Sequence, residues 1–246
     1  MSFHKNKIEE NLRRKGLFPE VLVLPQTTST NDVARTLLEE KVGDYLIAAD
    51  QQTKGKGSHG RSFFSPDETG FYLTFTVPAA DPETQMTLAA GVASVAAIEE
   101  VYGIHVGLKW VNDLQKDGKK VGGILCERVS SGTVIVGIGI NLRTPKNGFP
   151  EEISLTAGAL EVDVESASEL AAAIYGHFFL LVRESEKILT AYKKMCVTLG
   201  TDICYVVDGR ERQGKAIDVE EDGALLVLEE GKVHRYSTGD ISVRSV

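Results

Sequence analysis

The hydrophobic positions of the chain change their spacing several times, and each spacing predicts a different kind of element. Ile8 and Leu12 lie four residues apart among charged residues, which predicts a short helix that ends at Gly16. The elements predicted next are a strand over 21–24, a helix over 31–41 with Thr30 as its N-cap, a strand over 45–49, a half-buried strand over 71–77, and a buried helix that opens at Asp81, Pro82 and Glu83 and ends at Gly103. This alternation of strands and helices indicates an α/β body.

From residue 104 the pattern changes to consecutive strands. Asp117-Gly118 has the composition of a hairpin turn. Residues 130–132 predict a second turn, between strands over 121–129 and 133–142.

The last third of the chain divides into a helical part and a strand-rich part. Ser166 and Glu169 have the spacing of a capping box, which predicts a long helical region that reaches about Cys196. Short strand-like runs separated by glycine-containing turns then follow at 203–207, 215–219, 224–228 and 232–236. This spacing predicts a small barrel over residues 200–246, appended to a body over residues 1–199.

Composition and charge exclude some classes of protein. The 246 residues are 42% hydrophobic and 25% charged, and 27 Lys and Arg against 35 Asp and Glu leave a net charge of −8. An acidic chain is not expected to coat nucleic acid or anionic lipid with its whole surface. The most apolar stretch, 88–98, is far short of the ~20 residues that span a bilayer, and the N-terminus has no secretory signal pattern. Three cysteines without a C-x-x-C pair indicate reduced thiols in a cytoplasmic protein.

Two glycine motifs imitate nucleotide-binding signatures without their structural context. Gly55-x-Gly57-x-x-Gly60 follows a strand, but the residues after it do not begin the helix that a dinucleotide-binding fingerprint requires. Gly209-x-x-x-x-Gly214 precedes a lysine as in a P-loop, but a strand follows where a helix is needed. We expect a loop at the first motif and a hairpin turn at the second.

The loop over 51–66 is positively charged, although the chain as a whole has a net negative charge. It contains Lys54, Lys56 and Arg61 with His59, and no acidic residue occurs between 50 and 67. Glycines allow a ligand to approach the backbone N–H groups, so this loop suits a phosphate or a carboxylate. A solvated surface loop with incidental lysines explains the same residues.

Three further clusters have both a structural and a functional interpretation. Lys109 and Lys120 flank one hairpin and either converge on an anion or lie on a solvent face. Glycines repeat within the strands 122–125 and 137–141, which indicates either close approach of a ligand or a twisted sheet with bulges. Ser29-Thr30-Asn31 before a helix is, as a lone instance, most simply an N-cap. Neither a histidine pair with metal-ligand spacing nor a G-x-S-x-G nucleophile motif is present.

Taken in order, these clusters resemble the biotin protein ligases. The matching segments are Ser29-Thr30-Asn31, Gln52-Thr53-x-Gly55-Lys56-Gly57-x-x-Gly60-Arg61, Lys109-Trp110-x-Asn112-Asp113, Lys120-x-x-Gly123-Ile124-Leu125, Gly137-x-Gly139-x-Asn141 and Gly239-Asp240-Ile241-Ser242-x-Arg244. The resemblance runs from about residue 21 to the end. It implies a body like that of class II tRNA synthetases, with a mixed sheet and helices, followed by a small SH3-like barrel.

The resemblance also implies a reaction and a set of site residues. ATP and biotin would give biotinyl-5′-adenylate, and a lysine of a biotin carboxyl carrier protein would then take the biotinyl group. Catalytic roles would fall to Lys120, Lys109 and Arg61; biotin binding to Ser29, Thr30, Asn31, Gln52, Lys56, Gly57, Ser58, Trp110, Lys120, Gly123 and Gly139; nucleotide binding to Lys56, Arg61, Lys109, Asn112, Lys120, Asn141 and Arg244. Mg²⁺ would arrive with ATP, without a fixed set of protein ligands.

The chain departs from its relatives at a few positions. Val111 stands where many members have proline. Lys56 stands where many have arginine, and Ser58 where many have a second arginine. These last two changes are expected to weaken binding of the adenylate. About 20 residues precede the first predicted strand, too few for the winged-helix DNA-binding domain of some bacterial members, so no DNA binding is expected. An exposed sheet edge in the family often supports a homodimer, and no membrane association is expected. The alternatives are a lipoate–protein ligase of the same fold and, from another class, a non-catalytic nucleic-acid-binding regulator.

Overall fold

A computed structural model describes residues 3–78, 83–129, 132–207, 209–237, 241 and 243–245. Its body is a seven-stranded mixed sheet in the order β1-β2-β3-β7-β6-β5-β4. The strands are β1 Glu20–Leu24, β2 Tyr45–Ala49, β3 Gly70–Pro78, β4 Gly107–Lys109, β5 Asp113–Lys116, β6 Lys119–Val129 and β7 Thr133–Asn141. β1 and β2 are parallel, and the other neighbours are antiparallel.

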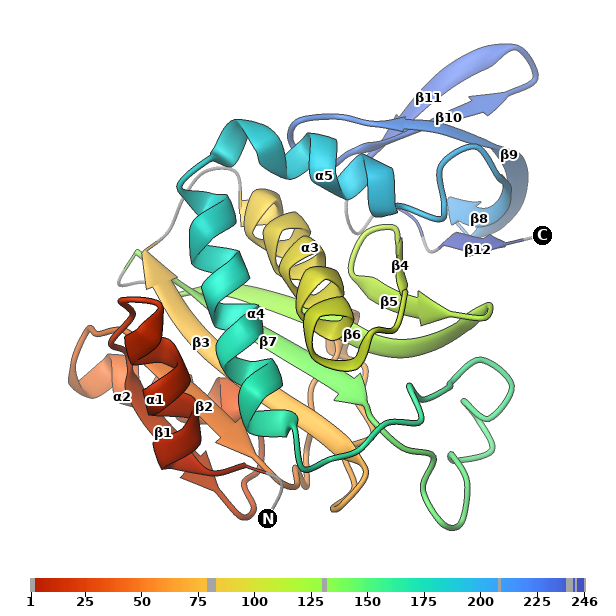
Figure 1. The fold of residues 1–246 in the computed structure, drawn as a ribbon. Coiled ribbons are helices and arrows are strands. Elements are labelled where there is room, and N and C mark those ends of the chain that lie inside the picture. The colour runs from red at the N-terminus through yellow and green to blue at the C-terminus, as the bar shows by residue number, and fades with distance from the viewer. Residues whose placement is uncertain are drawn as a thin grey trace.

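Helices cover both faces of this sheet. They are α1 Lys5–Arg14, α2 Thr30–Glu40, α3 Glu83–Tyr102, α4 Ala167–Val182 and α5 Ile188–Met195. α3 and α4 pack against each other over one face, and α1 lies beside α4 (Figure 1). α2 packs on β2, β3 and β7, and its apolar residues form a separate cluster with Tyr45, Ile47 and Ile135. Leu46 and Ala48 of β2 belong to the main core instead, so the two clusters lie on opposite faces.

This double cover corrects one prediction from the sequence. The strand over 71–77 was expected to be half buried, but β3 is buried along its whole length except at Pro78. Two polar residues of β3, Thr74 and Thr76, face the α2 side of the sheet. Their hydroxyl groups form hydrogen bonds within the protein and are not exposed to solvent. The alternation of threonine with apolar residues along β3 therefore marks a second face that packs against α2, and not a face exposed to solvent.

The helix boundaries confirm most of the predicted starts and stops. Gly16 and Gly103 follow α1 and α3 with positive φ angles, as helix stops require. Asp117 and Gly118 have φ angles of 50° and 76°, the conformation that a tight hairpin turn needs. Asp81 and Pro82 and the turn residues 130 and 131 lie outside the described residues.

One predicted cap is wrong in position, and a second is at the predicted residue but lacks the capping hydrogen bond. The N-cap of α2 is Ser29, not Thr30, and its side chain makes no capping hydrogen bond. Ser166 does precede α4, but no capping hydrogen bond forms there, and Glu169 carries a buried Oε2 without a partner. The long helical region also breaks after Val182, where a 3₁₀ turn, Ser185–Lys187, separates α4 from α5.

The C-terminal part forms an antiparallel sheet in the order β11-β10-β9-β8-β12 within the described residues. Its strands are β8 Asp202–Val207, β9 Arg210–Val219, β10 Leu225–Glu229, β11 Lys232–Tyr236 and β12 Val243–Ser245. Gly209 has a positive φ in the β8–β9 hairpin, and Gly214 lies within β9, so the second glycine motif belongs to a hairpin. Closure of this sheet into a barrel and the domain boundary at residue 200 stay predictions.

The body and the C-terminal sheet are joined by buried and charged contacts. The indole Nε1 of Trp110 donates to the carbonyl of Gly223 at 2.9 Å, and Lys193 of α5 pairs with Asp218 of β9 at 2.6 Å. Apolar residues of both parts belong to one core cluster. Across the described chain, the helices are too short or too polar to cross a bilayer.

Candidate functional site

A pocket lies where α2 begins, beside the glycine-rich loop 51–66 and strands β6 and β7. Its lining residues are Ser29, Thr30, Asn31, Gln52, Lys56, Gly57, Ser58, Phe63, Asn112, Lys120, Gly123, Ile124, Leu125, Gly137, Ile138 and Gly139. Five segments far apart in sequence therefore meet at one cavity. Its walls combine hydrogen-bonding side chains, apolar side chains and two lysines.

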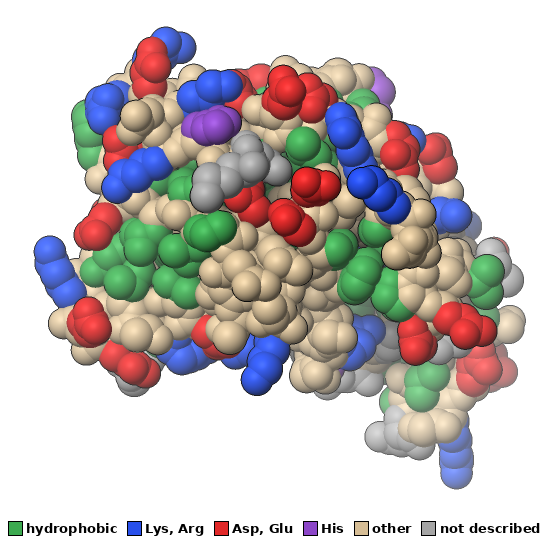
Figure 2. Space-filling model, turned by 90° about the horizontal axis from the view of Figure 1, so that it is seen from below, with side chains coloured by type: hydrophobic (Ala, Val, Ile, Leu, Met, Phe, Trp, Pro, Cys, Tyr) green, Lys and Arg blue, Asp and Glu red, His purple; other side chains and the backbone are tan. Residues whose placement is uncertain are grey.

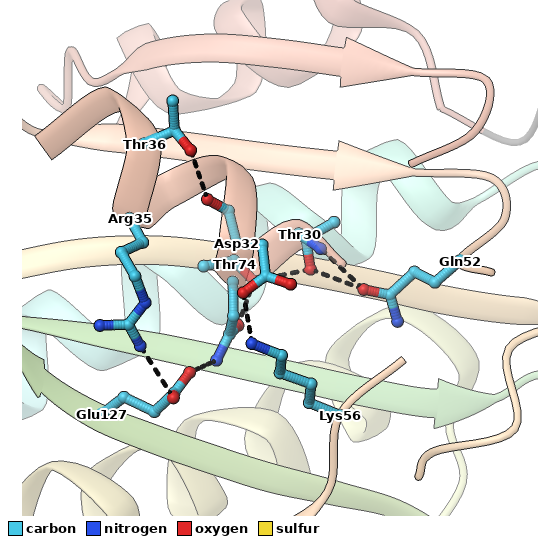
Figure 3. Close-up of polar contacts among 9 residues, drawn as sticks. Thr30, Asp32, Arg35, Thr36, Gln52, Lys56, Thr74 and Glu127 are labelled. Atoms are coloured by element: carbon cyan, nitrogen blue, oxygen red, sulfur yellow. Dashed lines mark hydrogen bonds and ion pairs between the residues drawn. The ribbon is translucent and has the colours of Figure 1, made fainter. Parts of the chain in front are cut away.

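One part of the pocket is a connected set of amide and hydroxyl groups. Both the backbone N–H and the hydroxyl of Thr30 donate to Gln52 Oε1, at 2.8 and 3.1 Å. Gln52 Nε2 donates in turn to Ser65 Oγ, whose hydroxyl donates to the carbonyl of Phe63. Figure 3 shows Thr30 and Gln52 pointing toward each other across the gap between α2 and the loop. These bonds fix the loop to the first turn of the helix.

Asn31 is held from two sides. Its Nδ2 donates to Glu127 at 2.8 Å, and its Oδ1 accepts from the Thr74 hydroxyl at 2.7 Å. Arg35 donates to the other oxygen of Glu127 at 2.9 Å. A hydrogen-bonding side chain fixed in this way is suited to bind a polar ligand group with little loss of conformational freedom on binding.

The repeated glycines of β6 and β7 make room for side chains of the site. A Cβ on Gly137 would lie 2.2 Å from Asn31 Oδ1, and one on Gly139 would lie 2.6 Å from the Phe63 ring. A Cβ on Gly123 would lie 3.3 Å from Lys120 Nζ. The sequence left open whether these glycines mark close approach of a ligand or a twisted sheet with bulges, and the structure shows pocket side chains in close approach to them.

Two lysines bring positive charge to the pocket, each paired with a carboxylate. Lys120 Nζ lies 2.5 Å from Asp113 Oδ1, and Lys56 forms an ion pair with Asp32 in the first turn of α2 (Figure 3). The ammonium groups can neutralise a carboxylate and a phosphate that must approach each other. The pocket therefore suits chemistry between two anions.

The loop 51–66 is closed at its far end by Tyr72. Its hydroxyl donates to the carbonyl of Pro66 at 2.8 Å, and its ring contacts Phe63 edge-on. Burial, with a smaller effect of Asp67, raises the pKa of Tyr72 above its ordinary value, so the phenol stays a neutral donor. The first glycine motif is accordingly a loop with a single 3₁₀ turn, Ser58–Gly60, and no helix begins in it.

Most of the residues predicted for the site lie together. Those that line the pocket are Ser29, Thr30, Asn31, Gln52, Lys56, Gly57, Ser58, Asn112, Lys120, Gly123 and Gly139. Asn112 donates its side-chain amide to the carbonyl of Ile124 at 2.8 Å and so fastens β5 to the pocket wall.

Five predicted residues do not line this pocket. Trp110, expected in the apolar wall, is 7% exposed and lies at the junction with the C-terminal sheet, because its indole N–H finds a carbonyl there. Lys109 stands opposite Asp113 in the β4–β5 register, and Arg61 is exposed and donates to Ser58. Asn141 donates to the carbonyl of Gly158 at 2.8 Å, which holds the segment after β7.

Arg244 is the fifth of these residues. It stands opposite Cys204 in the pairing of β12 with β8, and its side chain lies outside the description, as do residues 239, 240 and 242 of the C-terminal motif.

The sequence did not identify several groups that build the site. Phe63 and Ile138 line the pocket without having been singled out, Ile124, Leu125 and Gly137 were named only as parts of motifs, and Glu127, Thr74 and Asp32 hold polar side chains of the pocket. Alternation along β6 places Gly123, Leu125 and Glu127 on one face, and that pattern was the signal for Glu127. In the described part of the chain, no group of three or more His, Cys, Asp or Glu could hold a metal ion.

Comparisons with known proteins agree with the fold. The model of the Biotin/lipoate A/B protein ligase family matches residues 23–143, and that of the Biotin protein ligase C terminal domain matches residues 203–244. The chain is 30% identical to the bifunctional ligase/repressor BirA of Bacillus subtilis (strain 168), over 96% of this chain and 79% of the relative. It is 29% identical to the biotin–[acetyl-CoA-carboxylase] ligase of Mycobacterium tuberculosis, over 89% and 87%.

The similar solved structures are also biotin protein ligases. The biotin protein ligase from Aquifex aeolicus in complex with biotin and ATP matches with a TM-score of 0.79 and 28% identity, over 93% of this chain and 100% of that chain. The biotin protein ligase from Leishmania major in complex with biotinyl-5-AMP matches with a TM-score of 0.64 and 27% identity, over 90% and 100%.

Proposed function

The chain belongs to the biotin protein ligase family, and from that premise we propose that its pocket joins biotin to a carrier lysine through an adenylate. The biotin carboxylate attacks the α-phosphate of ATP and releases pyrophosphate. The amine of a carrier lysine then attacks the carbonyl of this mixed anhydride, loses a proton, and displaces AMP. The product is an amide. Relatives solved with biotin and ATP and with biotinyl-5-AMP support both the substrates and the intermediate.

The observation that carries this proposal is the composition of the pocket. Thr30, Asn31 and Gln52 supply fixed amide and hydroxyl groups for the cyclic urea of biotin. Lys120 and Lys56 line the same cavity and supply positive charge for the carboxylate and the phosphates. A carboxylate and an α-phosphate repel each other, so preorganised cations are the main catalytic device and no protein nucleophile is required.

The protein residues act here by binding and neutralisation. Lys120 lines the pocket and is held by Asp113, and we assign it to the point where carboxylate and α-phosphate meet. Lys56 can exchange Asp32 for a phosphate oxygen when the nucleotide binds. Lys109, Arg61, Asn141 and Arg244 remain proposals for nucleotide contacts.

We propose that Mg²⁺ enters with ATP, where it would neutralise phosphate charge. Mg²⁺ is commonly held by one or two carboxylates together with substrate phosphates and water. Around the pocket the described carboxylates Asp32 and Asp113 are each engaged by a lysine. We therefore assign no step to a metal held by protein ligands alone.

We propose a biotin carboxyl carrier protein as the macromolecular partner, since a relative is named as an acetyl-CoA-carboxylase ligase. We also propose that the chain does not act on DNA. Its net charge is −8, and on the face drawn in Figure 2 basic side chains are dispersed among acidic ones. Retardation of promoter DNA by the protein with biotin and ATP would contradict this. The homodimer and the cytoplasmic location stay predictions.

A thermal-shift comparison tests the choice of substrate. Biotin carries a cyclic urea that matches the amide and hydroxyl groups of the pocket, and lipoate has none. Biotin at saturating concentration is expected to raise the melting temperature by several degrees, as a ligand at 100 times its Kd stabilises by about 2.7 kcal/mol. A shift with lipoate and none with biotin would overturn the proposal in favour of a lipoate ligase.

A further inference from the structure

Both lysines of the pocket are neutralised by a carboxylate of the protein itself. Lys120 pairs with Asp113 on β5, and Lys56 pairs with Asp32 in the first turn of α2. Among the described residues that line the pocket, these two lysines are the only ionisable ones. Each pair has no net charge, so an anion that enters the pocket must compete with a carboxylate for the ammonium group.

The two pairs are held by different parts of the fold. Asp113 and Lys120 lie on the neighbouring strands β5 and β6, whose backbone pairing fixes their separation. Lys56 lies in the glycine-rich loop with a glycine on either side, and Asp32 lies on α2. Figure 3 shows the lysine side chain reaching from the loop to the helix. The pair between loop and helix is therefore the one that can separate without disturbing the sheet.

Asp32 keeps a favourable environment when Lys56 leaves it. It is the acidic residue in the first turn of α2, where the helix dipole stabilises negative charge. Its side chain is also 36% exposed, so water can solvate the carboxylate. The side chain of Asp113 is 23% exposed, and removing Lys120 would leave a more buried charge without its partner. Exchanging the carboxylate for a phosphate therefore costs less at Lys56 than at Lys120.

We propose that Asp32 is a positioning residue that holds Lys56 against α2 and competes with the phosphates of ATP for its ammonium group. This rests on the proposed function, since the competing anion is the nucleotide. The pair ties the loop to the helix, and ATP must break it to reach the lysine. Asp32 thus lowers the affinity for ATP, whereas Asp113 keeps its lysine throughout adenylation.

The substitution Asp32→Asn releases Lys56 and keeps the size of the side chain. The KM for ATP in biotin-dependent pyrophosphate exchange is expected to fall about threefold, the scale of a partly exposed ion pair, while kcat and the biotin Kd stay within about twofold. Calorimetric titration with α,β-methylene-ATP, which cannot release pyrophosphate, should show the same gain in affinity. A merely structural loss would raise the KM for ATP instead.

Two further variants serve as comparisons. Glu40→Gln removes the same charge from the last turn of α2, outside the pocket lining, and should leave the KM for ATP unchanged. Asp113→Asn should have the opposite effect to Asp32→Asn, because Lys120 loses the group that directs it. We expect its kcat to fall several-fold with no gain in affinity for ATP.

A double-mutant cycle separates competition for the lysine from direct repulsion of the phosphates. Lys56→Met removes a charge-assisted contact and is expected to raise the KM for ATP about 10-fold. If Asp32 acts through Lys56, adding Asp32→Asn to Lys56→Met should change the KM by less than about 1.5-fold. A threefold fall in both backgrounds would show repulsion across space and refute the competition. Asp32→Ser removes the same charge and carries the test if Asp32→Asn does not fold.

The outcomes separate this inference from the function beneath it. Folded wild-type protein without biotin-dependent exchange would refute the proposed function. Exchange in the wild type with an ATP KM that Asp32→Asn leaves unchanged or raises would refute the role of Asp32 alone. A fall of the same size in Glu40→Gln or in Asp113→Asn would refute it too.

Discussion

Lys120 Nζ lies 2.5 Å from Asp113 Oδ1, across two neighbouring strands and at the edge of the pocket. The backbone N–H of Lys120 also donates to the carbonyl of Thr156, and its carbonyl accepts from Gly158, both at 2.8 Å. The strand that carries this lysine is thus fixed on both sides, and its ammonium group is aimed by a carboxylate. A cation fixed in this way loses little freedom when an anion binds to it.

Lys120→Met should slow adenylation with little effect on folding. Charge-assisted hydrogen bonds contribute roughly 1.5–3 kcal/mol net, so the rate of biotin-dependent pyrophosphate exchange is expected to fall at least about 10-fold. Lys116→Met removes a lysine of the adjacent strand β5, which pairs with Asp117 on the hairpin and does not line the pocket. Full activity of Lys120→Met, or equal losses in the two variants, would remove Lys120 from the site.

Ser58→Arg should slow the escape of the intermediate. Ser58 lines the pocket and accepts a hydrogen bond from Arg61 at 3.1 Å, but its hydroxyl brings no positive charge to an adenylate phosphate. An arginine there should lengthen the residence time of preformed biotinyl-adenylate several-fold, with little change in its rate of formation. Dissociation is followed by a filter-binding chase with labelled adenylate. His59→Arg adds the same charge one residue away, outside the pocket lining, and equal off-rates in wild type and Ser58→Arg would show that position 58 is neutral.

Trp110→Phe should destabilise the protein and leave biotin affinity unchanged. The substitution removes the hydrogen bond from Nε1 to Gly223 and leaves a buried carbonyl without its partner, which costs about 1–3 kcal/mol. Urea unfolding measures the loss, and titration with biotin measures the affinity. A large change in biotin Kd at unchanged stability would return Trp110 to the wall of the pocket.

The pairing of Lys193 with Asp218 should make part of the stability depend on pH. The hydrogen bond from Lys193 holds the pKa of Asp218 below its ordinary value. A lowered folded-state pKa stabilises the protein above the ordinary carboxyl pKa, and this contribution is lost as the pH falls through the lowered value. Because both side chains are partly exposed, its size should stay below about 1 kcal/mol.

Lys193→Met tests this directly. The carbon-detected NMR titration of Asp218 should move back toward the ordinary carboxyl range, and the stability difference from wild type should disappear in strong acid. Lys194→Met is the control on the same helix. An unchanged titration of Asp218 would show that Lys193 does not lower its pKa.

Local signals in the sequence predicted the elements and much of the pocket. Glycine stops, the Asp117-Gly118 turn and the alternation of strands depend only on neighbouring residues, and the structure confirms them. The glycines of β6 and β7 were informative about the position of the pocket. A strand interior that lacks Cβ atoms allows another group to come close to the backbone, whether that group is a side chain or a ligand.

What the sequence could not predict depends on contacts between distant segments. Trp110 meets Gly223, 113 positions away, and no local pattern distinguishes an aromatic at a junction from one in a pocket wall. Thr30 was interpreted as a cap because capping is a local use of its hydroxyl, whereas its partners are Gln52 and Thr74. Glu127 shares a face of β6 with Gly123 and Leu125, but its partner Asn31 lies 96 positions away, and a carboxylate in a strand is more typical of a solvent-exposed face.

Exchange of labelled pyrophosphate into ATP, measured with and without biotin, tests the central claim most directly. It reports the adenylation step alone and requires neither the carrier protein nor a change of sequence. The account predicts exchange that depends on biotin and saturates with it, and that lipoate does not replace. Exchange supported by lipoate but not by biotin, or no exchange with either in folded protein, would contradict it.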